Sequence, residues 1–215
     1  MLRLYTYYRS SASFRVRIAL NLKGLAWTPE AVWLPTGEQA APAYRAVNPQ
    51  GLVPALIDGE RRLTQSLAII EYLEETHPEP PLLPTDPADR ARVRSLSMLI
   101  ASEIHPLNNL RVLAHLRKVL ALDEEAIAQW YRHWCDEGLV LFERELERGP
   151  AGRFCHGDVP GMADCCLVPQ IFNARRFDTK VERYPRVMRV FDACMSLDAF
   201  RAAEPAAQPD AQRGS

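Results

Sequence analysis

Clustered basic residues, long apolar runs and paired cysteines are all missing from this sequence. Its 26 lysines and arginines are scattered among 27 aspartates and glutamates, whereas nucleic-acid binding requires clustered positive charge to neutralise phosphates. No window approaches the roughly 18 apolar residues of a membrane span, and the N-terminal MLRLYTYY lacks an apolar run with a cleavage site. We therefore expect no nucleic-acid partner, no membrane partner and a cytoplasmic location.

Metal-binding and disulfide patterns are missing as well. The five cysteines are odd in number and include no C-x-x-C pair, which is typical of free thiols in a reducing compartment. The five histidines form neither an H-E-x-x-H motif nor a zinc-type spacing with the cysteines. We expect no metal site and no disulfide.

The apolar pattern that is present predicts an α/β unit at the start of the chain. With 47% apolar residues in 215, the chain can bury one large core or two small ones. Strand-type alternation begins at Leu2, and a helical period runs from Phe14 to Leu22. Further strand, turn and cap signals complete the order β-α-β-α-β-β-α by His77.

A proline-rich connector, PEPPLLPTDP, follows this unit and marks the expected domain boundary. Every period beyond the connector is helical. We therefore expect residues 1–80 to form the α/β domain and residues 88–203 to form an all-α domain. Residues 204–215 are small, polar and interrupted by proline, so we expect a flexible tail.

The stretch YYRSSASFRVRIAL places two serines where the first strand gives way to a helix. A helix N-terminus stabilises an anion, and a hydroxyl that donates to a thiolate favours its ionised form. Ala12 follows the serines, so the protein offers no thiol there and a bound thiolate would have to come from a ligand. On local sequence alone, however, Ser11 is favoured as a simple N-cap of the helix.

Two later segments sharpen this hypothesis. Proline in the Val53-Pro54 step cannot donate to a strand ladder, which leaves backbone groups nearby for an extended, peptide-like ligand. Gln65-Ser66 supplies a second helix N-terminus, which suits a carboxylate. The serine pair, the Val53-Pro54 step and Gln65-Ser66 are each weak evidence for a ligand site. Together, in this order within one α/β unit, they are stronger evidence.

These segments together resemble the glutathione transferase family, and RSSASFRVRIALNLKG is similar to its zeta class. The resemblance extends to NPQGLVPAL, QSLAIIEYL, HPLNNLRVL, GDVPGMADCCLVPQIFNARRF and the closing QPD, so it covers nearly the whole chain. It implies the glutathione transferase fold, in which a thioredoxin-like N-terminal domain precedes an all-helical C-terminal domain. It also implies glutathione as cofactor and a homodimer.

The resemblance further implies roles for individual residues. The implied catalytic residues are Ser11, Ser10 and Arg9, with Ser11 as first choice for the glutathione sulfur. The implied glutathione site comprises Ser10, Ser11, Gln39, Val53, Gln65, Ser66, His105 and Asn109. The implied site for a dicarboxylate substrate comprises Arg9, Arg111 and Arg176, and an arginine fork suits carboxylate geometry.

The implied activity is glutathione-dependent cis–trans isomerisation of a diketo dicarboxylic acid, maleylpyruvate or maleylacetoacetate, in aromatic compound catabolism. Arg111 tilts the expectation slightly toward maleylpyruvate. A general transferase that conjugates glutathione to electrophiles and a non-catalytic binding module remain as alternatives. A thioredoxin-type oxidoreductase is excluded more firmly, because no cysteine stands at the first helix.

The sequence departs from the zeta pattern at two positions. Ala12 replaces the usual cysteine, which puts cysteine-dependent dehalogenation in doubt but leaves isomerisation intact. Gly161 replaces the usual Ser or Thr of a capping box whose Asp164 is retained. Arg15 and Arg17, being arginines inside a helix, are expected on the surface or in interdomain salt bridges.

Overall fold

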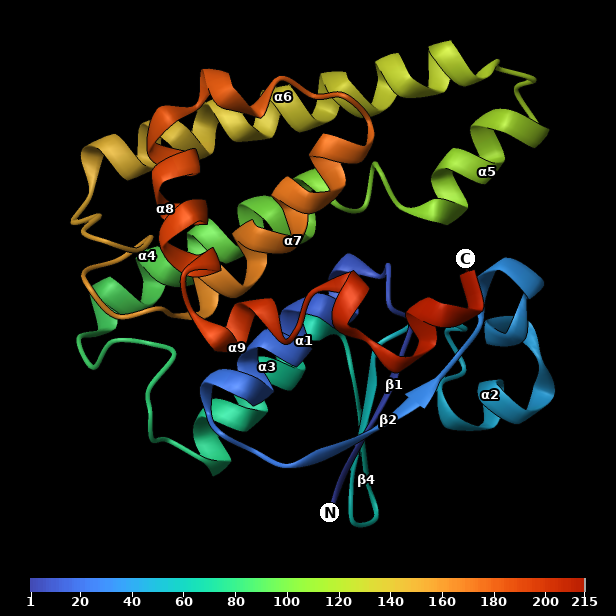
Figure 1. The fold of residues 1–215 in the computed structure, drawn as a ribbon, viewed down its shortest axis with the longest axis horizontal. Coiled ribbons are helices and arrows are strands. Elements are labelled where there is room, and N and C mark those ends of the chain that lie inside the picture. The colour runs from blue at the N-terminus through green and yellow to red at the C-terminus, as the bar shows by residue number, and fades with distance from the viewer. Residues whose placement is uncertain (215) are drawn as a thin grey trace. The chain divides into compact units, whose positions relative to one another are not determined.

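A computed structural model of the chain describes residues 1–214 (Figure 1). Contacts divide the chain into two units, one formed by residues 1–82 with the segment from Met195 onward, the other by residues 83–194. The first unit carries a four-stranded sheet, and the second is built from helices.

The sheet of the first unit has the strand order β2-β1-β3-β4. Its strands are β1 (Leu2–Thr6), β2 (Trp27–Ala31), β3 (Ala55–Asp58) and β4 (Arg61–Thr64). β1 pairs in parallel with β2 and antiparallel with β3, and β3 and β4 form a hairpin. The predicted order β-α-β-α-β-β-α and the thioredoxin-like fold are confirmed.

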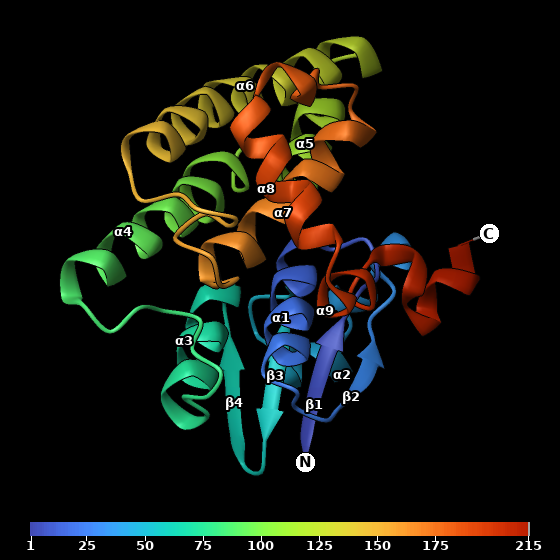
Figure 2. The same ribbon diagram turned by 60° about the vertical axis from the view of Figure 1, so that its left-hand side comes forward.

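Alternating side chains divide this sheet into two faces. Leu2 and Leu4 are buried while Arg3 between them is exposed, as the two-residue period of a strand requires. α1 (Ser11–Leu22) and α3 (Ser66–Thr76) cover one face, and α2 (Pro42–Val47) lies on the other (Figure 2). Tyr44 of α2 packs its ring 5.7 Å from that of Tyr5. Two short 3-10 helices, η1 (Leu34–Thr36) and η2 (Glu38–Ala40), precede α2.

Two arginines of α1 are buried, so the expectation that they lie on the surface is wrong. Arg15 is 2% exposed and Arg17 is fully buried. Arg15 Nη1 donates to Ser66 Oγ at 3.2 Å, and Arg17 donates to backbone and hydroxyl oxygens of its own unit. Burial lowers the pKa of Arg17 to about 9, against the opposing effect of the Asp210 carboxylate. Helical periodicity alone does not show that such polar partners surround a side chain.

Side-chain hydrogen bonds hold the C-terminal segment against the rest of the first unit. It contains α9 (Asp198–Arg201) and the 3-10 helices η5 (Pro205–Ala207) and η6 (Pro209–Gly214). α9 packs on α1, and Asn21 Nδ2 donates to Ala199 O at 3.0 Å. Gln208 and Asp210 are buried. Residues 195–203 therefore group with the first unit rather than the helical domain, and the expected flexible tail includes anchored residues.

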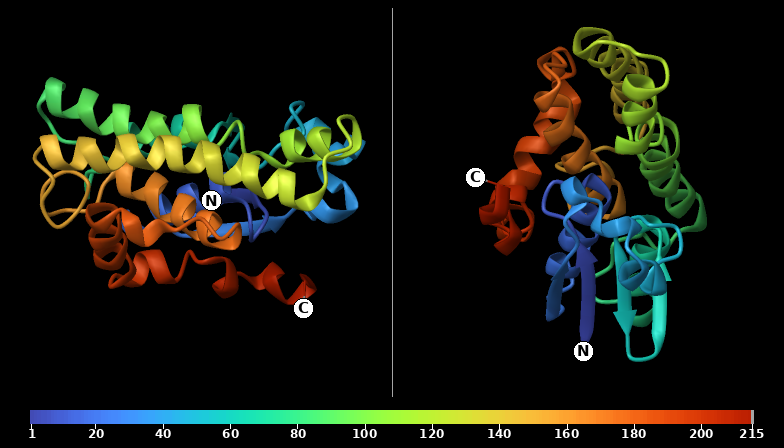
Figure 3. Two further views of the ribbon diagram at one scale, coloured as in Figure 1. Left: turned by 90° about the horizontal axis from the view of Figure 1, so that it is seen from above. Right: turned by 90° about the vertical axis from the view of Figure 1, so that its right-hand side faces the viewer.

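The second unit is helical throughout. Its helices are α4 (Pro87–Met98), the π-helix η3 (Leu99–Ile104), α5 (Leu110–Lys118), α6 (Glu124–Arg148), α7 (Met162–Arg176), the 3-10 helix η4 (Val181–Arg183) and α8 (Pro185–Met195). The rod formed by α4 and η3 lies beside α6 (Figure 3). Among the described residues, no helix is both long and apolar enough to cross a membrane.

Helix α7 is the core helix of this unit and begins with half of a capping box. Asp164 Oδ2 accepts from Gly161 N at 2.8 Å, and Asp164 Oδ1 accepts from Cys155 N at 2.9 Å. Gly161 has no side chain to return the bond, so the carboxylate alone caps the helix start. Burial raises the pKa of Asp164, and the two backbone N–H groups partly offset this rise.

A buried ion pair fixes the connector to the first unit. Lys23 Nζ lies 2.8 Å from Glu74 Oε2 and also donates to the carbonyl oxygens of His77 and Pro80. The same Glu74 oxygen accepts from Leu82 N at 2.9 Å. The proline-rich connector thus begins with anchored backbone groups rather than with a free spacer.

We predict that Lys23→Met lowers the free energy of unfolding by about 3–5 kcal/mol, because it leaves the Glu74 charge buried without its cation. Urea unfolding followed by circular dichroism measures the change. The double variant Lys23→Met/Glu74→Gln should recover much of the loss, since neither charge then remains buried. Equal losses in the single and double variants would contradict this account.

Candidate functional site

The register of the sheet brings four strand termini to one edge. Thr6 pairs with Ala31, Tyr5 with Ala55, and Ala55 with Thr64. The ends of β1, β2 and β4 and the start of β3 therefore share that edge, as the strand directions in Figure 2 show. The residues that follow or precede these strand ends include Arg9, Ser10, Ser11, Val53, Gln65 and Ser66. The structure thus gathers these predicted residues at one edge, where α1 and α3 both begin.

Ser10, and not Ser11 as predicted from the local sequence, caps the first helix. Ser10 is the N-cap of α1, with extended backbone (φ −70°, ψ 116°), and its side chain accepts from Ser13 N at 3.2 Å. Ser11 is the first helical residue and is buried. The prediction that Ser11 caps the helix is wrong, because Ser10 already fills that position.

Arg9 lies beside an aromatic cluster that the sequence analysis did not identify. Its guanidinium carbon lies 5.1 Å from the centre of the Tyr8 ring. The Tyr8 ring stacks on Trp33, with centroids 5.9 Å apart and planes 8° apart, and Tyr7 meets both rings edge-on. The adjacent tyrosines before Arg9 were the available signal. Cation–π contact limits the positions that the exposed Arg9 side chain occupies.

Gln65 connects β4 to α3 in a strained backbone conformation. Its φ of 69° and ψ of 118° are unusual for a residue with a side chain, and such conformations cost about 1–3 kcal/mol and cluster at functional sites. Its side-chain Nε2 donates to Gln50 Oε1 at 3.0 Å. Ser66, the first residue of α3, accepts from Arg15 Nη1 at 3.2 Å, which ties the starts of α1 and α3 together.

Val53 and Gln39 each have polar groups that a ligand could bind, in the backbone of Val53 and in the side chain of Gln39. Val53 precedes a cis peptide bond to Pro54 and lies outside the sheet ladder, which begins at Ala55. Gln39 lies in η2, and its Oε1 is buried with no hydrogen-bond partner among the described residues. A buried carbonyl oxygen without a donor is costly, so a ligand N–H there would be favourable.

The remaining predicted residues belong to the second unit. His105 directly follows η3, and Asn109 caps α5 by accepting from Arg111 N at 3.1 Å. Gly138 of α6 allows η3 to approach closely, because a Cβ there would lie 2.2 Å from Ile104 Cγ1.

Two exposed arginines complete the predicted set in this unit. Arg111 lies in the first turn of α5. Arg176 ends α7, and its Nη1 donates to Asn173 Oδ1 at 3.1 Å. Their guanidinium groups are accessible to a carboxylate.

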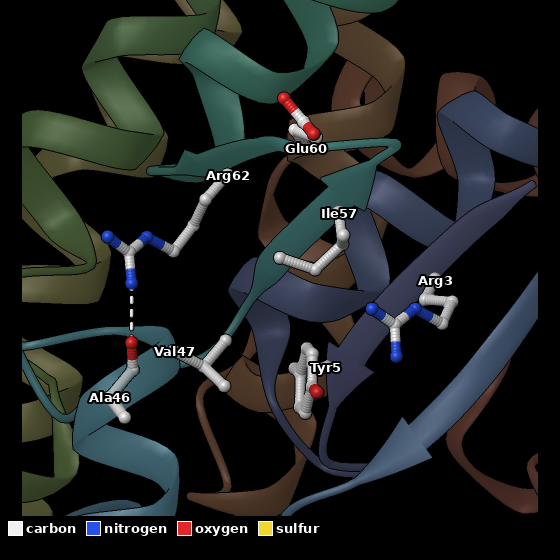
Figure 4. A pocket seen from close by; sticks show the side chains of 7 residues that line it. All are labelled: Arg3, Tyr5, Ala46, Val47, Ile57, Glu60 and Arg62. Carbon is white, nitrogen blue, oxygen red and sulfur yellow. Dashed lines mark hydrogen bonds between the residues drawn. The ribbon is translucent and has the colours of Figure 1, made fainter.

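A pocket of about 280 Å³ lies on the α2 face of the sheet and contains none of the predicted residues. Its lining consists of Arg3, Tyr5, Ala46, Val47, Ile57, Glu60 and Arg62. Figure 4 shows the hydrogen bond from Arg62 to Ala46 O that crosses it. Its charged side chains are exposed and of mixed sign, so this pocket has no set of groups directed at one ligand.

Comparisons with known proteins agree with this geometry. Residues 4–81 match the family model "Glutathione S-transferase, N-terminal domain", and residues 110–193 match the model "Glutathione S-transferase, C-terminal domain". The chain belongs to the glutathione S-transferase family. It is 43% identical to the "Glutathione S-transferase zeta class" protein of Euphorbia esula over 97% of this chain and 92% of that one, and it belongs to the same class.

Relatives of this transferase carry isomerase names. The maleylacetoacetate isomerase of Rhizobium meliloti is 52% identical over 94% of this chain and 95% of its own. The maleylpyruvate isomerase of Ralstonia sp is 49% identical over 97% and 99%. A solved holo structure of a zeta-class maleyl pyruvate isomerase has a TM-score of 0.95 at 49% identity, covering 97% of this chain and 99% of that one.

The cysteines of this transferase all belong to the second unit, whereas α1 belongs to the first. All five are buried, and burial raises the pKa of Cys135 to about 11 and also raises the pKa values of Cys155 and Cys194. Within residues 1–214, no group of three or more His, Cys, Asp or Glu side chains is arranged to hold a metal ion. A thiolate at the start of α1 would therefore belong to a ligand.

We predict that Ser10→Ala lowers the free energy of unfolding by about 1 kcal/mol, because the first turn of α1 loses its cap. Ser10→Asn should stay within a few tenths of a kcal/mol of the wild type, since asparagine caps equally well. Urea unfolding of both variants measures the difference. A free energy of unfolding of Ser10→Ala equal to that of the wild type would contradict the assignment of Ser10 as the N-cap.

We also predict that the native protein reacts slowly with a thiol-specific disulfide reagent at pH 8, because burial hinders access and keeps the Cys135 thiol protonated well below its pKa of about 11. Absorbance of the released thiolate measures the rate, with free glutathione as a rapid control. All five cysteines should react after unfolding in guanidinium. A thiol that reacts as fast as glutathione in the native protein would contradict this prediction.

Proposed function

We propose that this transferase is a glutathione-dependent cis–trans isomerase that converts maleylpyruvate or maleylacetoacetate into the fumaryl isomer. The observation that carries the proposal is the start of α1, where two hydroxyls and an arginine meet without a protein thiol. Relatives with these isomerase names match nearly the whole chain. A solved maleylacetoacetate isomerase from Methylobacterium extorquens, with a TM-score of 0.94 and 43% identity, holds malonate and glutathione.

The residues at the sheet edge fit glutathione by the chemistry of their groups. Glutathione is an extended peptide, and the backbone of Val53 is available for strand-like pairing. The buried Gln39 Oε1 requires an N–H donor, which a peptide provides. The Ser66 hydroxyl and the N-terminus of α3 suit the γ-glutamyl carboxylate.

Ser66 is prepared for this role by Arg15. Its oxygen accepts from the buried guanidinium at 3.2 Å, so the hydroxyl proton is directed elsewhere. A carboxylate at the start of α3 would receive that proton as a hydrogen bond. Gln65, in its strained backbone conformation, would fix the turn from β4 into α3, where this carboxylate binds.

The start of α1 would hold the sulfur. When bound, glutathione supplies a thiolate nucleophile whose reversible addition to a conjugated cis double bond permits rotation to the trans form. The helix N-terminus and the Ser11 hydroxyl stabilise negative charge there without a formal cation. Ser10 keeps a hydroxyl proton while its oxygen caps the helix.

The dicarboxylate would be recognised by arginines. Arg9 stands next to the serine pair, and Arg111 and Arg176 are exposed at helix ends in the second unit. Guanidinium forks bind carboxylates in a bidentate manner. This charge pattern favours an acidic substrate over the apolar electrophiles of a general conjugating transferase, and Arg111 tilts the choice slightly toward maleylpyruvate.

The proposal also assigns His105 and Asn109 of the second unit to glutathione binding. The N-cap role of Asn109 occupies its Oδ1, so its Nδ2 is the group left to donate to a ligand. A cytoplasmic homodimer acting in aromatic catabolism completes the proposal. Sedimentation at several protein concentrations tests the dimer.

We predict that purified protein isomerises maleylpyruvate or maleylacetoacetate only with glutathione, because no protein thiol is available at the site. Loss of the cis-acid absorbance measures turnover. S-methylglutathione, which has no free thiol, should not support it. Ser11→Ala should lower kcat by about 10²-fold or more, since a donor to developing charge is lost.

Matched arginine variants test substrate recognition. Arg176→Lys should raise KM about tenfold through loss of the bidentate fork, whereas Arg175→Lys at the neighbouring exposed position should not. No turnover of either acid despite measurable glutathione binding would overturn the isomerase and favour the conjugating transferase or the binding module.

A further inference from the structure

The QPD motif near the C-terminus has no role in the function proposed so far, yet it meets the loop that carries the candidate catalytic residues. Asp210 Oδ2 accepts from Tyr8 N at 2.9 Å, although 202 positions separate the two residues. Asp210 is only 6% exposed. Its carboxylate therefore belongs to the interior of the first unit.

Gln208 sets the position of Asp210. Its Nε2 donates to the carbonyl oxygens of Ala202 and Glu204, both at 2.9 Å. Ala211 N donates to Gln208 O at 3.0 Å, which closes the turn around Pro209. The first and last residues of the motif thus have separate tasks: the amide folds the segment, and the carboxylate reaches Tyr8.

Arg17 completes the contact from the opposite side. Its Nη2 donates to Tyr8 O at 3.0 Å, its Nη1 to Thr6 Oγ1 at 3.1 Å, and its Nε to Ala203 O at 3.0 Å. The buried guanidinium therefore joins the β1–α1 loop to the C-terminal segment. The charge of Asp210 favours the charged form of Arg17 and raises its pKa against the effect of burial.

Tyr8 is consequently held at both of its backbone polar groups. Asp210 holds the N–H and Arg17 holds the carbonyl oxygen. The Tyr8 ring, stacked on Trp33, lies under the guanidinium of Arg9. Ser10, the N-cap of α1, follows directly in the chain. A shift of Tyr8 would therefore move both the arginine and the serines.

We propose that Asp210 is a positioning residue for the isomerisation, acting through Tyr8 and Arg17 to hold Arg9 and the serine pair in place. This role rests on the proposed function. Glutathione binding itself depends mainly on Val53 and Ser66 and is left intact. Loss of Asp210 affects the orientation of Arg9 toward the acid and the ionisation of the sulfur.

The test compares Asp210→Ala with Asp210→Asn, which keeps an acceptor oxygen but removes the charge. Asp198→Asn removes an exposed charge from the same C-terminal segment. Ile70→Val removes one buried methylene from α3 and serves as a destabilised comparator. All variants are measured at a temperature at which circular dichroism shows them folded.

Asp210→Ala should lower kcat/KM for the acid about tenfold or more, since small misplacements of catalytic groups are costly. KM for the acid should rise, while the dissociation constant of glutathione, measured at a pH at which the bound thiol is protonated, stays within about twofold, because the peptide contacts lie elsewhere. The pKa of bound glutathione, followed by thiolate absorbance, should rise. Amide exchange at Tyr8 should quicken, and Asp210→Asn should fall between Asp210→Ala and wild type.

Unchanged kinetics and thiolate pKa in Asp210→Ala would overturn the positioning role. The same changes in Ile70→Val or Asp198→Asn would also overturn it, because they would then reflect stability or surface charge. If wild-type protein binds glutathione but isomerises neither acid, the proposed function fails. Thiolate titration and Tyr8 exchange then still decide whether Asp210 positions the loop.

Discussion

The pairing of β1 with two neighbours of opposite direction is the constraint on which the rest of the first unit depends. β1 runs parallel to β2 and antiparallel to β3, so two strand ends and one strand start meet at a single edge. A one-residue slip would turn Leu4 outward and Tyr5 into the core. Register therefore fixes the core of the first unit and, at the same time, the positions of the functional loops in that unit.

Buried cations form the second layer of this organisation. Arg17 lies within α1, and Lys23 is the C-cap residue of the same helix. Each donates hydrogen bonds to carbonyl oxygens of segments outside the sheet. Each also has a carboxylate near it, Asp210 in one case and Glu74 in the other. Desolvating a charge is costly unless several oxygens surround it. The loops must therefore place their carbonyl oxygens around each buried cation. These additional hydrogen bonds order the loops more tightly than their backbone–backbone hydrogen bonds alone would.

The sequence predicted the elements that depend on neighbouring residues and missed those that depend on distant ones. Alternation predicted the strands, turn signals predicted the hairpin, and helical periodicity predicted α3. Periodicity could not show that Arg15 and Arg17 are buried, because their oxygen partners come from other segments. Composition alone could not show that Asp210 is anchored, since its partner Tyr8 lies at the other end of the chain. The cap moved from Ser11 to Ser10 because both serines satisfy the same local rule.

The doubled serine separates two demands on one helix start. A capping oxygen must accept a backbone N–H, as Ser10 does from Ser13, and a group that stabilises an anion must donate. In the proposed reaction, the helix dipole and hydroxyl protons favour the thiolate, so the start of α1 itself needs no lysine or histidine. Arg9, resting on Tyr8, is then available for the charge of the substrate. Activation of sulfur and recognition of the acid are thereby assigned to adjacent but different groups, and each can be altered without removing the other.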